Sequence, residues 1–140
     1  MKIDFVDWPD RPDVYMPYTP AITVTGGRLA FFAGVTAAPV YHSHPHIPAE
    51  FDNIPLDMAT QARMTLENLK RSVEAVGGTM ESIVSCRQFL TNVELQNDLI
   101  QAWKEYRPGS KPCTTTVQVV RLATDPRCLI EIDAIAVVDD

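Results

Sequence analysis

The sequence predicts an α+β domain of two layers, a mixed β-sheet with two helices on one face. Two apolar stripes with the period of an α-helix, in residues 58–76 and 94–106, predict the helices. Segments of alternating apolar and polar residues lie before, between and after them, as is typical of half-buried strands. Two helices can cover only one face of such a sheet, so its other face must be wet or buried in an oligomer.

The first third of the chain predicts strands and a long loop. Proline-rich residues 1–20 form an irregular lead-in with one short strand at 2–7. Residues 21–25 alternate in polarity, Gly26-Gly27 is a two-residue hairpin turn, and residues 28–33 are the expected return strand. Residues 35–56 contain four prolines and three histidines. A connection this long inside a compact domain is usually functional or mobile.

The remaining elements have clear boundary signals. Asp57 is the expected N-cap of the first helix, and Gly77-Gly78 ends it at Val76. A strand at 83–90 follows, and Asn92 caps the second helix. Strands at 114–122 and 129–138 complete the domain.

Strand alternation then assigns side chains to the uncovered face of the sheet. Five side chains are expected to share that face: Thr114, Thr116, Gln118, Glu131 and Asp133. Asp133 is either solvated or raises the pKa of Glu131 by like-charge repulsion.

Composition restricts the class of protein. The 140 residues predict a single domain spanning 1–140, and a net charge of −6 argues against a nucleic-acid partner. Three widely spaced cysteines, Cys86, Cys113 and Cys128, are expected to be free thiols in a reducing compartment. The N-terminus has no apolar core of a signal peptide, and no apolar stretch could span a bilayer. We therefore expect a cytoplasmic protein without a membrane partner.

Five segments resemble a known family. They are PYTPA (17–21), FFAG (31–34), TLENLKRSVEAVGGTMESIV (65–84), VVRL (119–122) and IEIDAIAV (130–137). In this order and spacing they are similar to the Rid family, also called YjgF/YER057c/UK114. The resemblance implies a chorismate-mutase-like fold and a homotrimer around a central barrel. It also implies small-molecule sites in the clefts between subunits, hydrolysis of enamine or imine intermediates to a carbonyl compound and ammonia, and no metal or organic cofactor.

The chemistry of such a site is consistent with the residues present. An imine carbon needs a positioned water, and a carboxylate that holds the water can take its proton and return it to the leaving nitrogen. Glu131 matches the family's water-binding glutamate and is the expected catalytic residue. The backbone of Ala33 and Gly34 would orient the substrate, and Tyr18 matches the family's cleft tyrosine.

The chain departs from the family pattern where the substrate carboxylate is bound. Thr114 stands where deaminating members carry an arginine, Thr116 where they carry a cysteine, and Ala33 where they carry a serine. Because a threonine cannot neutralise a carboxylate, we expect an atypical substrate unless another cation substitutes. Arg87 and Arg121 are possible substitutes, although alternation places Arg121 on the face opposite Thr114.

The histidines of the 35–56 loop allow two interpretations. In an extended segment His42, His44 and His46 would share one side, and imidazoles suit zinc. Pro45, however, favours polyproline geometry, which would scatter the three rings, so no metal site is predicted. Alternatively, one histidine reaches into a neighbouring cleft as an acid, base or carboxylate partner.

Three functions remain open on the sequence. The first is a hydrolytic deaminase of enamines or imines with an atypical substrate. The second is a non-catalytic small-ligand-binding or chaperone-like protein, which the missing arginine favours. The third is another hydrolase or a tautomerase on the same scaffold, using a loop histidine.

Overall fold

The computed structural model describes residues 1–10 and 13–140. Its main sheet has four strands in the order β3-β6-β4-β5. Their bounds are β3 (Arg28–Val35), β4 (Ile83–Leu90), β5 (Cys113–Gln118) and β6 (Ile130–Val138). β6 pairs antiparallel with both β3 and β4, whereas β4 and β5 are parallel, so the sheet is mixed as the sequence predicts.

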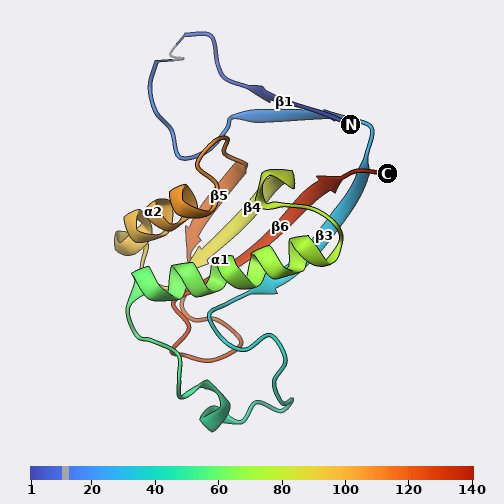
Figure 1. Ribbon diagram of the computed structural model, residues 1–140. Helices are drawn as coiled ribbons and strands as arrows, with labels where there is room; N and C mark the ends of the chain where they lie inside the picture. The colour runs from blue at the N-terminus through green and yellow to red at the C-terminus, as the bar shows by residue number, and fades with distance from the viewer. Residues whose placement is uncertain (11–12) are drawn as a thin grey trace.

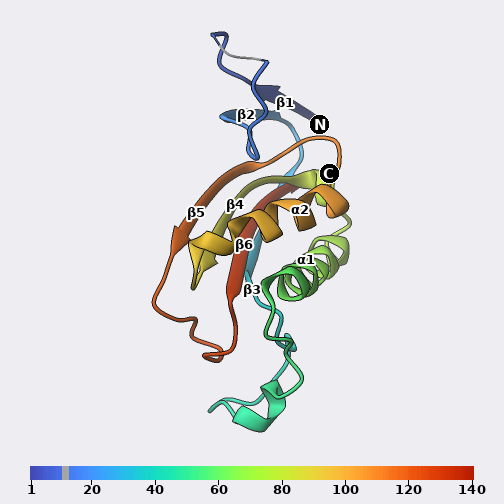
Figure 2. The ribbon, with the colours of Figure 1, turned by 90° about the vertical axis from the view of Figure 1, so that its left-hand side faces the viewer.

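Two helices, α1 (Met58–Ala75) and α2 (Gln96–Tyr106), lie on the same side of this sheet (Figures 1 and 2). The Asp57 carboxylate accepts a 2.9 Å hydrogen bond from the Thr60 amide, as expected of an N-cap. Gly77, at a φ of 86°, ends α1 in the left-handed conformation that glycine adopts without steric cost. The Asn92 side chain caps a short 3-10 turn, Val93–Leu95, directly ahead of α2. The predicted α+β class is confirmed.

The core lies between the helices and the sheet. Alternate residues of β6, from Ile130 to Ala136, face the helices and are buried. From α1 the side chains of Leu66, Leu69 and Val73 pack against them. None of the helices in the described residues is long and apolar enough to cross a membrane.

The opposite face of the sheet is covered by no helix among the described residues (Figure 2). Large apolar side chains stand on it, including Leu29 (65% exposed), Phe31 (72%) and Val117 (42%). Their strand neighbours Ala30 and Phe32 instead pack against the core. An apolar, uncovered sheet face of this kind is typical of a surface that another protein chain covers.

The N-terminal strands form a separate two-stranded ribbon, β1 (Lys2–Val6) with β2 (Ala21–Thr25), at one end of the molecule (Figure 1). The predicted hairpin between 21–25 and 28–33 is therefore wrong, because β2 pairs with β1 and β3 pairs with β6. Gly26 and Gly27 do have positive φ angles of 77° and 82°. They carry the chain from the ribbon into the sheet instead of folding it back on itself.

The predicted shared face of β5 and β6 is also wrong. Thr114 and Thr116 lie beside Cys86 and Gln88 in the parallel register of β4 and β5, and both of those side chains are buried on the helix side. Glu131 alternates with the buried Ile130 and Ile132 and therefore lies on the open side. The strand at β5 is shorter than predicted and ends at Gln118.

Candidate active site

A pocket with a volume of about 220 Å³ lies between α2, the start of β5 and the N-terminal segment. It brings together three of the predicted binding residues, Tyr18, Thr114 and Thr116. Trp103 and Ile100 of α2 add apolar wall. A concave site with apolar walls and a few polar groups is the usual form of a small-molecule site.

The floor of the pocket is a chain of hydrogen bonds between neutral groups. Buried Gln88 donates from Nε2 to Thr116 Oγ1 at 2.8 Å and accepts at Oε1 from Trp103 Nε1 at 2.5 Å. Thr114 donates from Oγ1 to the Pro112 carbonyl at 3.1 Å. The threonines are thus held by the protein itself, so their hydroxyl positions are fixed before a ligand arrives.

Two cations that the sequence reasoning missed, Lys104 and Lys111, also line this pocket. Their ammonium groups lie 4.8 and 4.4 Å from the centroid of the Tyr15 ring, so each lysine makes a cation–π contact with this ring. Arg107 lines the pocket too, but its guanidinium is buried and donates to the Met80 and Ile83 carbonyls. The lysines therefore provide the positive charge that Thr114 does not. In the sequence, Lys104 directly follows Trp103 and Lys111 lies two residues before β5 begins at Cys113, and these positions could have pointed to the two lysines.

Thr19 joins the N-terminal segment to the residues directly ahead of β5 by two hydrogen bonds. The Thr19 amide donates to the Pro112 carbonyl at 3.1 Å, and the Thr19 hydroxyl donates to the Lys111 carbonyl. Thr19 is buried by these contacts. This attachment holds Tyr18 and Tyr15 against β5 and α2.

The other predicted residues, Ala33, Gly34 and Glu131, meet at a second place. The register of β3 against β6 shifts between Phe32 and Val35, which leaves Ala33 and Gly34 opposite the single residue Asp133. This is a β-bulge, in which the extra residue lacks a ladder partner. The Glu131 carboxylate packs on Gly34: a Cβ at that position would lie only 2.7 Å from Oε2. Glycine at position 34 thus lets the Glu131 carboxylate lie against the backbone.

The electrostatics of Glu131 suit proton transfer. Burial raises the pKa of its carboxyl above the ordinary value, and the negative charge of Asp133 raises it further. Arg87, one of the suggested substitutes for the arginine, instead binds Asp133 on the open face, with Nη2 2.6 Å from Oδ2. Arg87 lies on the opposite face from the threonines, because it alternates with Gln88 along β4.

The two groups of predicted site residues do not meet within one chain. Thr114 and Thr116 face the helix side, whereas Glu131 faces the open side. One chain therefore holds the predicted site residues in two separate places, one around the pocket and one at the β3 bulge.

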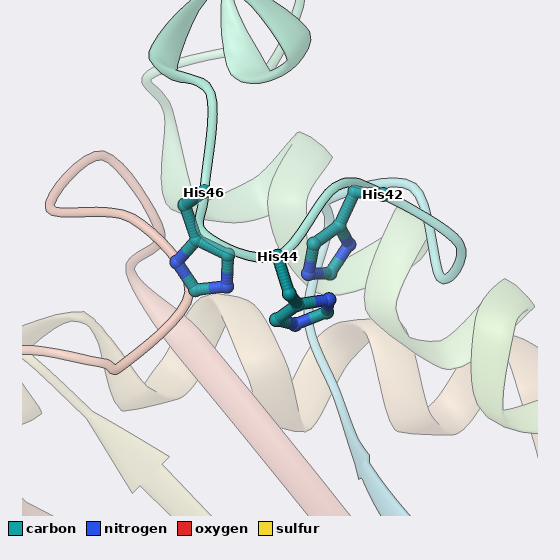
Figure 3. Close-up of side chains that lie close together, drawn as sticks. All are labelled: His42, His44 and His46. Carbon is teal, nitrogen blue, oxygen red and sulfur yellow. The ribbon is translucent and has the colours of Figure 1, made fainter.

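The three histidines lie together on the loop at the end of the molecule away from the ribbon (Figures 1 and 3). Their ring centroids are 4.8 to 5.1 Å apart. The expectation that Pro45 scatters the rings is wrong, because the loop turns back on itself between His42 and the 3-10 turn Pro48–Phe51. None of them lines the pocket beside α2.

Comparison with known proteins establishes the family. A model of the family described as Endoribonuclease L-PSP matches residues 9–138. The chain belongs to the Rid (YjgF/YER057c/UK114) family. Protein DfrA of Myxococcus xanthus is 32% identical over 126 residues, covering 90% of this chain and 88% of that protein. TdcF of Escherichia coli, named as a candidate reactive intermediate deaminase, is 30% identical over 76% of this chain and 85% of its own.

Solved structures of Rid proteins share the fold. The Rid-family protein YyfB of Yersinia pestis superposes with a TM-score of 0.77 over 99% of this chain and all of its own, at 22% identity. Escherichia coli TdcF, in a crystal structure with bound serine, superposes with a TM-score of 0.65 at 28% identity, covering 91% and 93% of the two chains. The structural comparison and the sequence comparison thus place the chain in the same family.

Proposed function

We propose that this protein is a hydrolytic deaminase that converts a reactive, anionic enamine or imine to a carbonyl compound and ammonia. The observation that supports this most is the Glu131 carboxylate, half-buried against the backbone of a β-bulge with its pKa raised. The similarity to TdcF supports the same reaction class. The substrate is a small molecule, and the net charge of −6 gives no support for an RNA ligand.

In the proposed reaction one carboxylate acts on one water molecule, as base and then as acid. Glu131 as carboxylate holds a water and takes its proton while the oxygen attacks the imine carbon, so that a C–O bond forms and the C=N π bond moves to nitrogen. The protonated Glu131 then returns the proton to the nitrogen, which gives a neutral carbinolamine. The Glu131 carboxylate next takes the hydroxyl proton of this carbinolamine and passes it to the nitrogen as the C–N bond breaks, so that ammonia leaves as the carbonyl forms. An enamine enters the same sequence after it is protonated at carbon to the imine. A carboxyl group whose pKa is raised toward neutrality performs both steps more evenly than an ordinary one.

In this proposal the pocket beside α2 and the β3 bulge with Glu131 are two halves of one site, which a homotrimer brings together. A neighbouring chain that covers the open sheet face would bring its pocket beside the bulge of the first. The exposed Leu29, Phe31 and Val117 provide apolar surface for such an association. Light scattering on the purified chain tests this: a trimer supports the composite site, and a stable monomer contradicts it.

Lys104 and Lys111 define the expected substrate class. Two ammonium groups at the pocket bind a carboxylate as point charges, in place of the two-pronged arginine of other family members. The serine bound in the TdcF crystal is consistent with an amino-acid-derived ligand. We therefore expect imines and enamines that carry a carboxylate, bound with weaker orientation than an arginine gives.

Ammonia release from freshly generated 2-imino acids and 2-aminoacrylate is the decisive assay. We expect release above the buffer rate, and Glu131→Gln should reduce it about 100-fold or more, as loss of a general base does. Lys111→Ala should raise KM without a comparable fall in kcat. Unchanged turnover in Glu131→Gln would contradict the role of this residue.

Thr114 favours a second candidate function, a non-catalytic ligand-binding or chaperone-like role, because the arginine of the deaminating members is absent. That role predicts saturable binding of a small carboxylate with no product. The histidine-dependent hydrolase or tautomerase receives no support, since none of the three histidines lines the pocket.

A further inference from the structure

We propose that His42, His44 and His46 form a binding site for a transition-metal dication, with Zn²⁺ as the best-matched ion. One ring nitrogen from each histidine lies within 4.8 Å of those of the other two. Figure 3 shows the three rings converging below the turn of the loop. This site is independent of the proposed deaminase reaction.

The spacing of the rings suits coordination after a small movement. Two nitrogens bound tetrahedrally at about 2.1 Å from zinc lie about 3.4 Å apart. The rings must therefore close by about 1.4 Å at most from their present spacing. Because His44 is exposed, its side chain can rotate toward the other two rings without disturbing the core.

His42 is already oriented as a ligand. Its Nδ1 lies 2.7 Å from the Pro39 carbonyl oxygen. A carbonyl can only accept, so Nδ1 carries the proton and Nε2 presents its lone pair. A backbone carbonyl on the remote nitrogen is the usual outer contact of a metal-binding histidine, because it fixes both the tautomer and the ring orientation.

A buried aromatic ring supports the cluster from below. Phe51, only 1% exposed, contacts His42 and His46 edge to face, with centroid distances of 5.2 and 5.7 Å. Its position restricts the rotation of both imidazoles. The rings are therefore gathered before an ion binds.

The loop itself is held by side chains from distant parts of the chain. Arg127 donates to the Asp52 carboxylate and to the Pro48 carbonyl, both at 2.8 Å. Asn68 of α1 donates to the Thr36 carbonyl at 2.8 Å, at the start of the same loop. Binding an ion to a loop that is already ordered costs little conformational entropy, which favours affinity.

The charge and the coordination number also favour a dication. The Glu50 carboxylate accepts a 3.1 Å hydrogen bond from the amide of Ser43, the residue between His42 and His44, and so places a negative charge beside the cluster. Among the described residues three histidines form the cluster, which leaves the fourth tetrahedral position of zinc to water. Three protein ligands and an exchangeable water are typical of zinc sites that bind or activate an exogenous ligand.

The test is calorimetric titration of the untagged, metal-free protein with ZnCl₂. We expect one ion per chain, a higher melting temperature with zinc, and at least about a 10-fold loss of affinity in the double variant His44→Gln, His46→Gln. Tyr41→Ala, at a 95% exposed neighbouring position, and Cys113→Ser are matched controls and should bind as the unmodified chain does.

Zinc binding that survives the double variant, or that disappears in Cys113→Ser, would overturn the proposal. Circular dichroism of the apo variants checks that each is folded, because the double variant loses the ring contact of His46 with buried Phe51. Absence of zinc binding by the unmodified chain would also overturn it. Ammonia release plays no part in these readouts, so failure here leaves the proposed deaminase reaction untouched.

Discussion

Gly34→Ala tests whether the position of the Glu131 carboxylate controls the reaction. The added Cβ would lie 2.7 Å from Oε2, 2.9 Å from Cδ and 3.0 Å from Cγ of Glu131. Ordinary contacts of a Cβ begin at 3.4 Å, so the carboxylate must retreat by about 0.7 Å. Gly34 does not have a positive φ, so alanine introduces no backbone strain.

The displacement should affect rate far more than stability. A reacting group misplaced by about 1 Å can lose about 100-fold in rate, so we expect kcat for ammonia release to fall about 10- to 100-fold. The clash is with the end of a flexible side chain, so the free energy of unfolding should change by less than about 1 kcal/mol.

The assay is steady-state ammonia release, with urea unfolding measured in parallel. Gly109→Ala is the matched control, because its Cβ would meet only Glu81 Oε1 at an ordinary 3.7 Å. Full activity in Gly34→Ala, with Glu131→Gln inactive, would show that the bulge does not position the carboxylate.

Three further predictions concern stability, thiol reactivity and pH. Gln61→Leu leaves three partly buried backbone groups without their 2.7 to 2.8 Å partners, so urea unfolding should show a loss of about 3 kcal/mol; a loss below about 1 kcal/mol would contradict this. Burial raises the pKa of Cys86 to about 11 and also raises that of Cys128, so a thiol reagent at neutral pH should label both only after unfolding. The deaminase rate should rise with pH as Glu131 ionises. Asp133→Asn removes a negative charge that raises the pKa of Glu131, so the pH–rate profile should shift to lower pH. A shift to higher pH would contradict the role of Glu131 as the base.

Local signals in the sequence predicted much of the fold. The Asp57 cap, the glycines that end α1 and the bounds of β4 are set by residues within a few positions of each other, and each is confirmed. The family resemblance assigned Glu131 and Gly34 to one site, and the structure shows that the two residues are in contact, whereas their roles in that site stay a prediction.

Nonlocal features could not be read in the same way. Which face Thr114 occupies depends on the register of β5 against β4, and a slip of one residue reverses every side chain. The partner of β2 and the convergence of His42 with His46 likewise depend on contacts between segments, which single-sequence alternation does not contain. Lys104 and Lys111 were missed for the same reason.

The attachment of the N-terminal ribbon has a consequence for how ligands enter. A ribbon of two strands is marginally stable alone. Thr19, just before β2, donates hydrogen bonds to the carbonyls of Lys111 and Pro112, which lie directly ahead of β5. Amide protons of β1 and β2 should therefore exchange with solvent well before those of β6. Each such opening removes one wall of the pocket while the sheet stays folded, so a bound carboxylate should slow deuterium uptake in this ribbon first.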